Sequence, residues 1–266
     1  MGQQGDFLQV LREQGYAVDD LRPLLNGNGL SGNISNTEVT TGTTVFAMKY
    51  RAGVLVAGDR RATAGNVVMY DRTDKVLELD RFSVLAIAGV PATAFEMARI
   101  LEHSFKYYRR SQLQDLSFEG KLRALSTLLK NNAPAALAGT GTVAPIFAGY
   151  DQLEECGKIF FYDILGAEFE AVEYAVSGSG SPTIRGILFY MNRWGNGPVA
   201  GLDEEEALTF VLRLMTSAAE FDSATGGVDA HAQLYPIVKR ISAEGVRTIP
   251  AERLKTLFSE KVLNHV

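Results

Sequence analysis

The chain has 266 residues, of which 46% are hydrophobic and 21% charged, so it can bury one large core or two smaller ones. Its formal net charge of −5, without any basic run, gives no electrostatic reason to expect nucleic acid or an anionic membrane as a partner. One cysteine and three histidines exclude an intrachain disulfide and a zinc-type cluster, so we expect no metal, no cofactor and a reducing, cytoplasmic setting.

The first 42 residues differ from the rest of the chain. They carry two basic and five acidic residues, a net charge of −3 (2 minus 5), and include the stretch "NGNGLSGNISN", which cannot sustain regular structure. Only residues 6–16 and 19–25 show a weak helical pattern. Early acidic residues and the lack of a basic region before an apolar one argue against a secretory signal. We therefore expect a detachable segment over residues 1–42 and a single domain over residues 43–266.

From residue 43 onwards, strands and helices alternate in groups. Short β-forming segments at 43–50 and 53–59 flank the turn "RAG", and a second hairpin over 75–89 turns near Asp80 and Arg81. The remaining expected elements are helices at 92–110 and 117–130, strands at 143–150, 157–164 and 168–176, helices at 182–192 and 203–220, a hairpin around 243–245 and a helix from Pro250 to about Leu263. The longest apolar stretch, 84–95, contains Gly89 and Pro91 and is shorter than the roughly 20 residues of a membrane span. The element order predicts an α+β fold with helices outside two stacked sheets.

The first hairpin predicts one contact directly. If its turn is at 51–53, the numbers of cross-strand partners sum to about 103, so Thr44 lies opposite Asp59. Lys75, which begins the next hairpin, is placed to pair with that carboxylate. Taken singly, Asp59 is as easily a solvated turn residue in "GDRR", and Lys75 an ordinary surface lysine.

The stretch "TTGTTVFAMKY" at 40–50 offers a nucleophile, although its threonines also suit the start of a strand. If the chain is cut after Gly42, Thr43 has both a hydroxyl and an α-amine, whose reference pKa is about 7.7 to 8.0. A Lys75 cation nearby would lower the pKa of that amine, and Asp59 would keep Lys75 charged. Gly42, which lacks Cβ, would let the backbone adopt the geometry in which Thr43 Oγ attacks the preceding carbonyl.

Three further segments offer groups for such a site. Gly89 ends a strand just before a helix, so its N–H can stabilise an oxyanion, or the segment is a simple strand-to-helix turn. The "SGSGSP" loop at 177–182 completes no phosphate-binding motif, and "FDSATGG" at 221–227 resembles a plain helix terminator. Both loops could instead bring hydroxyls and a carboxylate to the Thr43 amine.

Together, "GTT" (42–44), "AGDRRAT" (57–63), Lys75, "IAG" (87–89), "GSG" (178–180) and "DSATGG" (222–227) resemble the proteasome β subunits, most closely the actinobacterial ones. The resemblance runs from Gly42 to the C-terminus, and Asp59 and Lys75 follow Thr43 by 16 and 32 residues, as the family requires. It implies an N-terminal-nucleophile hydrolase with a four-layer αββα sandwich of two antiparallel sheets. It also implies a threonine-type endopeptidase whose propeptide, residues 1–42, is removed autocatalytically between Gly42 and Thr43.

The resemblance also implies roles for individual residues. Thr43 would be the nucleophile, Asp59 and Lys75 the polar pair beneath it, and Ser179, Asp222 and Thr225 the group around its amine. Thr63 would hold the substrate backbone. The pocket for the residue before the scissile bond would be lined by Ala62, Thr73, Ile87, Pro91 and Phe95, and this mostly apolar lining predicts cleavage after apolar residues.

Two positions depart from the family pattern. Position 225 is threonine where serine is usual, which keeps the hydroxyl and adds a methyl group. Pro91 stands where the family commonly has alanine and uses its backbone N–H to bind the peptide. Because proline has no N–H, we expect weaker binding of peptide-like inhibitors.

The implied partners are copies of the same chain in heptameric rings, proteasome α subunits in a stacked four-ring particle, a regulatory ATPase reached through the α rings, and unfolded protein substrates. Two alternatives stay open. One is an N-terminal-nucleophile amidase for small molecules, although the inserted loops of a closed ligand pocket are not evident in the sequence. The other is an inactive structural subunit, against which the intact Thr43, Asp59 and Lys75 argue.

Overall fold

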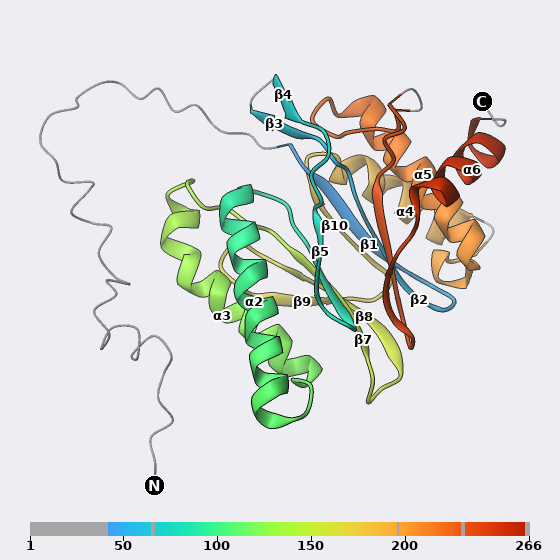
Figure 1. Cartoon of the computed structure of the whole chain (residues 1–266). Helices are drawn as coiled ribbons and strands as arrows, with labels where there is room; N and C mark the ends of the chain where they lie inside the picture. The colour runs from blue at the N-terminus through green and yellow to red at the C-terminus, as the bar shows by residue number, and fades with distance from the viewer. Residues whose placement is uncertain (1–41, 65–66, 196, 230–231, 264–266) are drawn as a thin grey trace, which may run out of the picture. The chain divides into compact units, whose positions relative to one another are not determined.

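A computed structural model describes residues 42–64, 67–195, 197–229 and 232–263 (Figure 1). The helices expected at 6–16 and 19–25 lie outside these ranges. Within them, two five-stranded sheets, a small two-stranded sheet and five α-helices are present. None of the helices in the described ranges combines the length and hydropathy needed to cross a membrane.

Both large sheets are antiparallel throughout. The first contains, in spatial order, β10 (Tyr174–Gly178), β1 (Thr44–Tyr50), β2 (Gly53–Gly58), β11 (Ile237–Ser242) and β12 (Gly245–Thr248). The second contains β5 (Val76–Asp80), β6 (Ser83–Ala86), β7 (Ile146–Asp151), β8 (Cys156–Tyr162) and β9 (Glu168–Ala171). The two-stranded sheet pairs β3 (Ala62–Ala64) with β4 (Val67–Tyr70).

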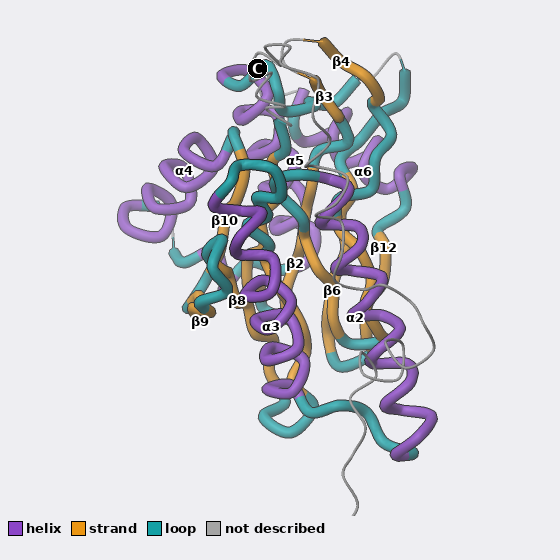
Figure 2. Tube along the Cα trace, turned by 90° about the vertical axis from the view of Figure 1, so that its left-hand side faces the viewer, coloured by secondary structure: helices purple, strands orange, loops and turns teal. Residues whose placement is uncertain are grey.

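The helices cover the outer faces of the two sheets (Figures 1 and 2). Helices α2 (Pro91–Gln112) and α3 (Phe118–Leu137) pack on the second sheet. Helices α4 (Ser181–Trp194), α5 (Glu204–Phe221) and α6 (Ala251–Lys261) pack on the first. The four layers are those of the predicted αββα sandwich, and the prediction of the fold is confirmed.

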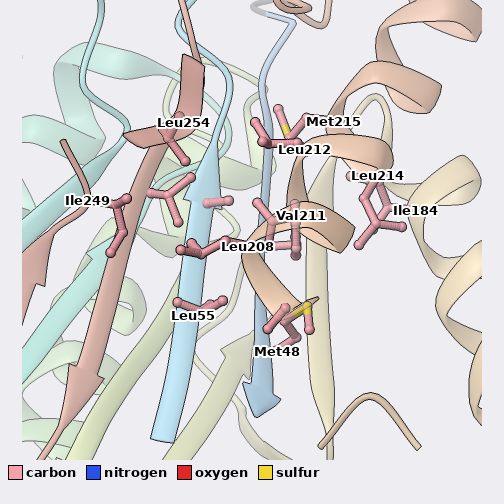
Figure 3. Close-up of a cluster of buried hydrophobic side chains, with 14 of the residues drawn as sticks. Met48, Leu55, Ile184, Leu208, Val211, Leu212, Leu214, Met215, Ile249 and Leu254 are labelled. Carbon is pink, nitrogen blue, oxygen red and sulfur yellow. The ribbon is translucent and has the colours of Figure 1, made fainter. Parts of the chain in front are cut away.

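Side-chain alternation in β1 explains the layering. Val45 and Ala47 lie in the apolar layer between the sheets, whereas Phe46 and Met48 lie in the layer below α5. Successive residues of a strand point to opposite faces, so an uninterrupted apolar strand can serve two cores. Figure 3 shows the second of these cores, where the α5 side chains at helical spacing, Leu208, Val211, Leu212 and Met215, lie over Met48 and Leu55.

The predicted helix starts agree with the structure. The Ser117 side chain accepts a hydrogen bond of 3.1 Å from Gly120 N, and Asp203 accepts one of 2.9 Å from Glu206 N in a capping box. Helix α3 is longer than predicted, because it continues past Lys130 to Leu137 and includes Pro134 in its last turn.

The prediction of a single strand over 168–176 is wrong. The segment 168–176 forms two strands, β9 and β10, that belong to different sheets, and the chain passes between the sheets at Val172 and Glu173. Ala171 and Ala175 are both buried in the layer between the sheets, so the period-two pattern continues through the crossing and does not reveal it. The short β3 and β4 pair was also not predicted.

Candidate active site

The register of the first hairpin places Thr44 beside Asp59. Val45 lies opposite Gly58, as the predicted sum of 103 requires. One residue further along, Asp59 N donates a hydrogen bond of 3.0 Å to Thr44 O, and Thr44 N donates one of 2.8 Å to Asp59 Oδ1. The predicted contact between the start of β1 and this carboxylate is confirmed.

The Asp59 carboxylate is fully buried and accepts four hydrogen bonds. Oδ1 accepts from Thr44 N at 2.8 Å and from Lys75 Nζ at 2.7 Å. Oδ2 accepts from Arg61 N at 2.9 Å and from Gly226 N at 3.0 Å. A buried charge is tolerated when it is paired and its lone pairs are satisfied, and both conditions hold here.

Lys75 is the cation of this pair and is only 3% exposed. Besides Asp59, its Nζ donates to Arg61 O at 2.5 Å and to Gly42 O at 3.4 Å. Burial lowers the pKa of Lys75, and the neighbouring Asp59 carboxylate opposes that shift. Because an ammonium group has three donors and no acceptor, the three surrounding oxygens suit the charged form.

The bond between Gly42 and Thr43 is held on both sides. On one side, Gly42 N donates to Thr63 Oγ1 at 3.1 Å, and Gly42 O accepts from Lys75. On the other, Thr43 O accepts from Ser179 N at 2.9 Å. Both residues are buried, and a Cβ added to Gly42 would lie 1.9 Å from Ala224 Cβ. The structure thus gives a steric reason for the glycine, in addition to the backbone freedom expected from sequence.

Ser179, Asp222 and Thr225 come together on the other side of Thr43. Asp222 Oδ2 accepts from Ser179 Oγ at 2.6 Å and from Thr225 Oγ1 at 2.5 Å. Burial raises the pKa of Asp222, but the hydrogen bonds from Ser179 and Thr225 outweigh it, and the pKa lies below its usual range. Asp222 is therefore a carboxylate near neutral pH, as the expected group around the amine requires.

A small cavity of about 80 Å³ lies beside the Gly42–Thr43 bond. Its described lining includes all five residues expected in the specificity pocket, namely Ala62, Thr73, Ile87, Pro91 and Phe95, together with Gly42, Thr43, Lys75 and Gly89. Gly89 has a φ of 119° and precedes Val90, whose N–H donates to Thr142 O at 2.8 Å. Thr63, expected to hold a substrate backbone, here holds the backbone of Gly42.

Two side chains that make polar contacts in the site were not found from sequence. Arg61 Nη1 donates to Ser223 O at 2.8 Å, and so ties the Asp222 loop to the segment after β2. The Thr44 hydroxyl lies 2.5 Å from Thr225 Oγ1, whereas the sequence used Thr44 only to set the register. Their nearness in sequence to predicted site residues could have indicated both, because Arg61 is two residues from Asp59 and Thr44 follows Thr43.

Replacing Asp59 by asparagine should lower the free energy of unfolding by about 3–5 kcal/mol. An amide offers one oxygen and one NH₂, so either orientation turns N–H donors toward a pair of donors, Thr44 N and Lys75 or Arg61 N and Gly226 N. Urea unfolding followed by circular dichroism measures the loss. The control is Asp115→Asn in the exposed pair with Arg109, which should change stability by less than about 0.5 kcal/mol. Equal effects of the two variants would contradict the prediction.

Comparison with known proteins gives one consistent result. The family described as "Proteasome subunit" matches residues 39–231. A "Proteasome subunit beta" from Acidimicrobium ferrooxidans is 38% identical over 88% of this chain and 82% of its own length. One from Streptomyces griseus is 39% identical over 80% and 73%, and "Proteasome subunit beta 2" from Thermomonospora curvata is 36% identical over 85% and 78%. The chain therefore belongs to the proteasome subunit family, among the β subunits, which are threonine-type endopeptidases.

Proposed function

We propose that Thr43 becomes the N-terminal nucleophile of this endopeptidase after the chain cuts itself behind Gly42. The observation that carries the proposal is the arrangement around that bond, in which Gly42 contacts Thr63 and Lys75 while Thr43 contacts Ser179. A peptide bond held in this way, next to a buried cation, has the surroundings of a bound substrate.

In the proposed self-cleavage, Thr43 Oγ attacks the Gly42 carbonyl carbon. The C–N bond to Thr43 breaks, the Thr43 nitrogen takes up the proton that Oγ has lost and becomes the α-amine, and Gly42 is left as an ester on Thr43 Oγ. Water then hydrolyses the ester, releasing residues 1–42 with a terminal carboxylate and restoring the hydroxyl. Lys75 Nζ, 3.4 Å from Gly42 O, supports the step because a cation at the carbonyl oxygen stabilises the negative charge that develops there.

The mature site would use the same atoms on other peptides. The α-amine of Thr43, with a reference pKa of about 7.7 to 8.0, takes the proton of Thr43 Oγ as the oxygen attacks a substrate carbonyl. The amine then passes this proton to the leaving nitrogen, an acyl-enzyme ester forms, and water releases the second product. Asp59 holds Lys75 in place, and Ser179, Asp222 and Thr225 orient the amine. The role of Gly89 as an oxyanion donor stays a prediction.

The pocket supports a preference for apolar residues before the cut. Of the five expected lining residues, Ala62, Ile87, Pro91 and Phe95 are apolar, and Thr73 is uncharged. A charged side chain placed there would lose its hydration without gaining a partner other than Lys75. We infer that unfolded proteins are cleaved mainly after apolar residues.

Family membership implies assembly with α subunits into a proteasome core. We propose heptameric rings of this chain within a cytoplasmic four-ring particle that a regulatory ATPase serves through the α rings. Exposed apolar surface supports such assembly, since Val67, Val68, Met69 and Tyr70 of β4 are each at least 50% exposed. The aromatic cluster of Phe189, Tyr190 and Trp194 on α4 is similarly exposed.

The direct test is Thr43→Ala in the full chain coexpressed with the α subunit of the same organism. The wild-type chain should lose residues 1–42 and hydrolyse fluorogenic peptides that have an apolar residue before the cut. The variant should keep its initial mass of 28.9 kDa and show no hydrolysis. Thr140→Ala, in an exposed loop, is the control and should behave like wild type. Normal processing of Thr43→Ala, read by intact mass, would refute the proposal.

Gly42→Ala should slow self-cleavage at least tenfold. The new Cβ would lie 1.9 Å from Ala224 Cβ, so the bond would have to leave its place between Thr63, Lys75 and Ser179. The time course of precursor loss measures the rate. Adding Ala224→Gly removes the opposing Cβ and should restore part of the rate. If Gly42→Ala alone is processed at the wild-type rate, the close approach of Gly42 to Ala224 is unimportant for self-cleavage.

Pro91→Ala should strengthen the binding of reversible peptide inhibitors by roughly fivefold, about 1 kcal/mol for one added hydrogen bond. Pro91 is the first residue of α2 and lines the cavity. An N–H at this helix position has no partner within the helix, so an alanine there could offer it to the peptide. Inhibition constants measure the effect, with Pro134→Ala in α3 as the control. No gain in affinity would count against the assigned binding mode.

A further inference from the structure

We propose that Thr44 is a positioning residue, whose hydroxyl acts through Thr225 to orient the groups around the Thr43 amine. The inference rests on the proposed function, because it concerns the same nucleophile. Thr44 is fully buried at the start of β1, and its Oγ1 accepts a hydrogen bond of 2.8 Å from Gly180 N. The same oxygen lies 2.5 Å from Thr225 Oγ1.

The direction of this contact follows from the proton that each hydroxyl owns. Thr225 Oγ1 lies 2.5 Å from Asp222 Oδ2, and a carboxylate can only accept. The single hydroxyl proton of Thr225 is therefore committed to Asp222. The proton between Thr44 and Thr225 must then come from Thr44. A directed chain results, from Gly180 N–H to Thr44, to Thr225 and to the Asp222 carboxylate.

The loop that carries Ser179 is shaped around the same two hydroxyls. A Cβ on Gly180 would lie 2.6 Å from Thr44 Oγ1 and 2.8 Å from Thr225 Oγ1, so a larger residue would separate them or displace the loop. Ser179 N, in the adjacent peptide unit, holds Thr43 O at 2.9 Å. Thr44 therefore fixes both the Thr225 hydroxyl and the loop that binds the nucleophilic residue.

This series of hydrogen bonds determines whether Thr225 donates to or accepts from the Thr43 amine of the mature protein. With its proton committed to Asp222 and one lone pair taken by Thr44, the Thr225 oxygen can only accept a further hydrogen bond. An amine that donates an N–H to this oxygen keeps its own lone pair free to act as the base toward Thr43 Oγ. Without the Thr44 hydroxyl, Gly180 N–H loses its acceptor and the Thr225 oxygen loses a donor that fixes its orientation.

The test compares Thr44→Val with Thr44→Ser in the full chain coexpressed with its α subunit. Valine keeps the branched shape and removes the hydroxyl, whereas serine keeps the hydroxyl and removes a methyl group. We expect serine to retain kcat within about threefold of wild type. Thr44→Val should lower kcat at least tenfold. It should change KM little, because Thr44 lies outside the described lining of the cavity. A purely packing role predicts the reverse order, so valine performing as well as serine would overturn the proposal.

Thr225→Val tests whether Thr44 acts through Thr225. This variant should show the same loss of kcat as Thr44→Val. The kcat of the double variant should be no lower than that of the less active single variant. If the fold-losses of kcat in the two single variants multiply in the double variant, the two residues act independently and the proposal is overturned. If Thr44→Val does not assemble, Thr225→Val alone decides, since wild-type kcat in that variant would also overturn it.

Two controls separate the possible failures. Thr209→Val removes another buried hydroxyl, one that donates to Glu205 O at 2.8 Å within α5, and it should leave kcat unchanged. The wild-type particle must hydrolyse the peptide. An inactive wild type refutes the proposed function, whereas an active wild type with a fully active Thr44→Val refutes only the role of Thr44.

Discussion

The rest of the site depends on the hydrogen bonds that the buried Asp59 carboxylate accepts. These four hydrogen bonds come from the start of β1, the segment after β2, the residue before β5 and the loop after α5. An uncompensated charge in this position would be very unfavourable, so the native fold is stable only when these four segments meet. The free energy of folding thereby positions the groups that surround the Gly42–Thr43 bond.

The sequence predicted one part of this centre, the contact between Asp59 and the start of β1, because the geometry of that contact is local. A hairpin with a short turn has a fixed register, and so the position of Asp59 opposite Thr44 followed from counting residues. The four-layer fold followed from the order of strands and helices. The division of 168–176 into two strands did not follow, because Ala171 and Ala175 bury against the same layer from different sheets. Residue periodicity reports which face is buried and cannot report which sheet a residue joins.

The parts of the site that the sequence could not predict depend on contacts between distant residues. Thr44 and Thr225 are 181 positions apart, and threonines are too common for such a pair to be recognised without the fold. The close packing of Gly42 on Ala224 is hidden for the same reason, and backbone freedom was the only explanation that the sequence could offer. The resemblance to a family located the loops, while the fold shows which atoms meet.

The contacts that hold the Gly42–Thr43 bond also determine when the proposed self-cleavage could occur during biosynthesis. They come from Thr63, Lys75 and Ser179, with Ala224 packed against Gly42, so they are spread over most of the sequence that follows the bond. A ribosome must translate nearly the whole messenger before the last of them exists. A nascent polypeptide therefore lacks the complete arrangement, and under the proposed self-cleavage residues 1–42 would remain attached until synthesis is nearly finished.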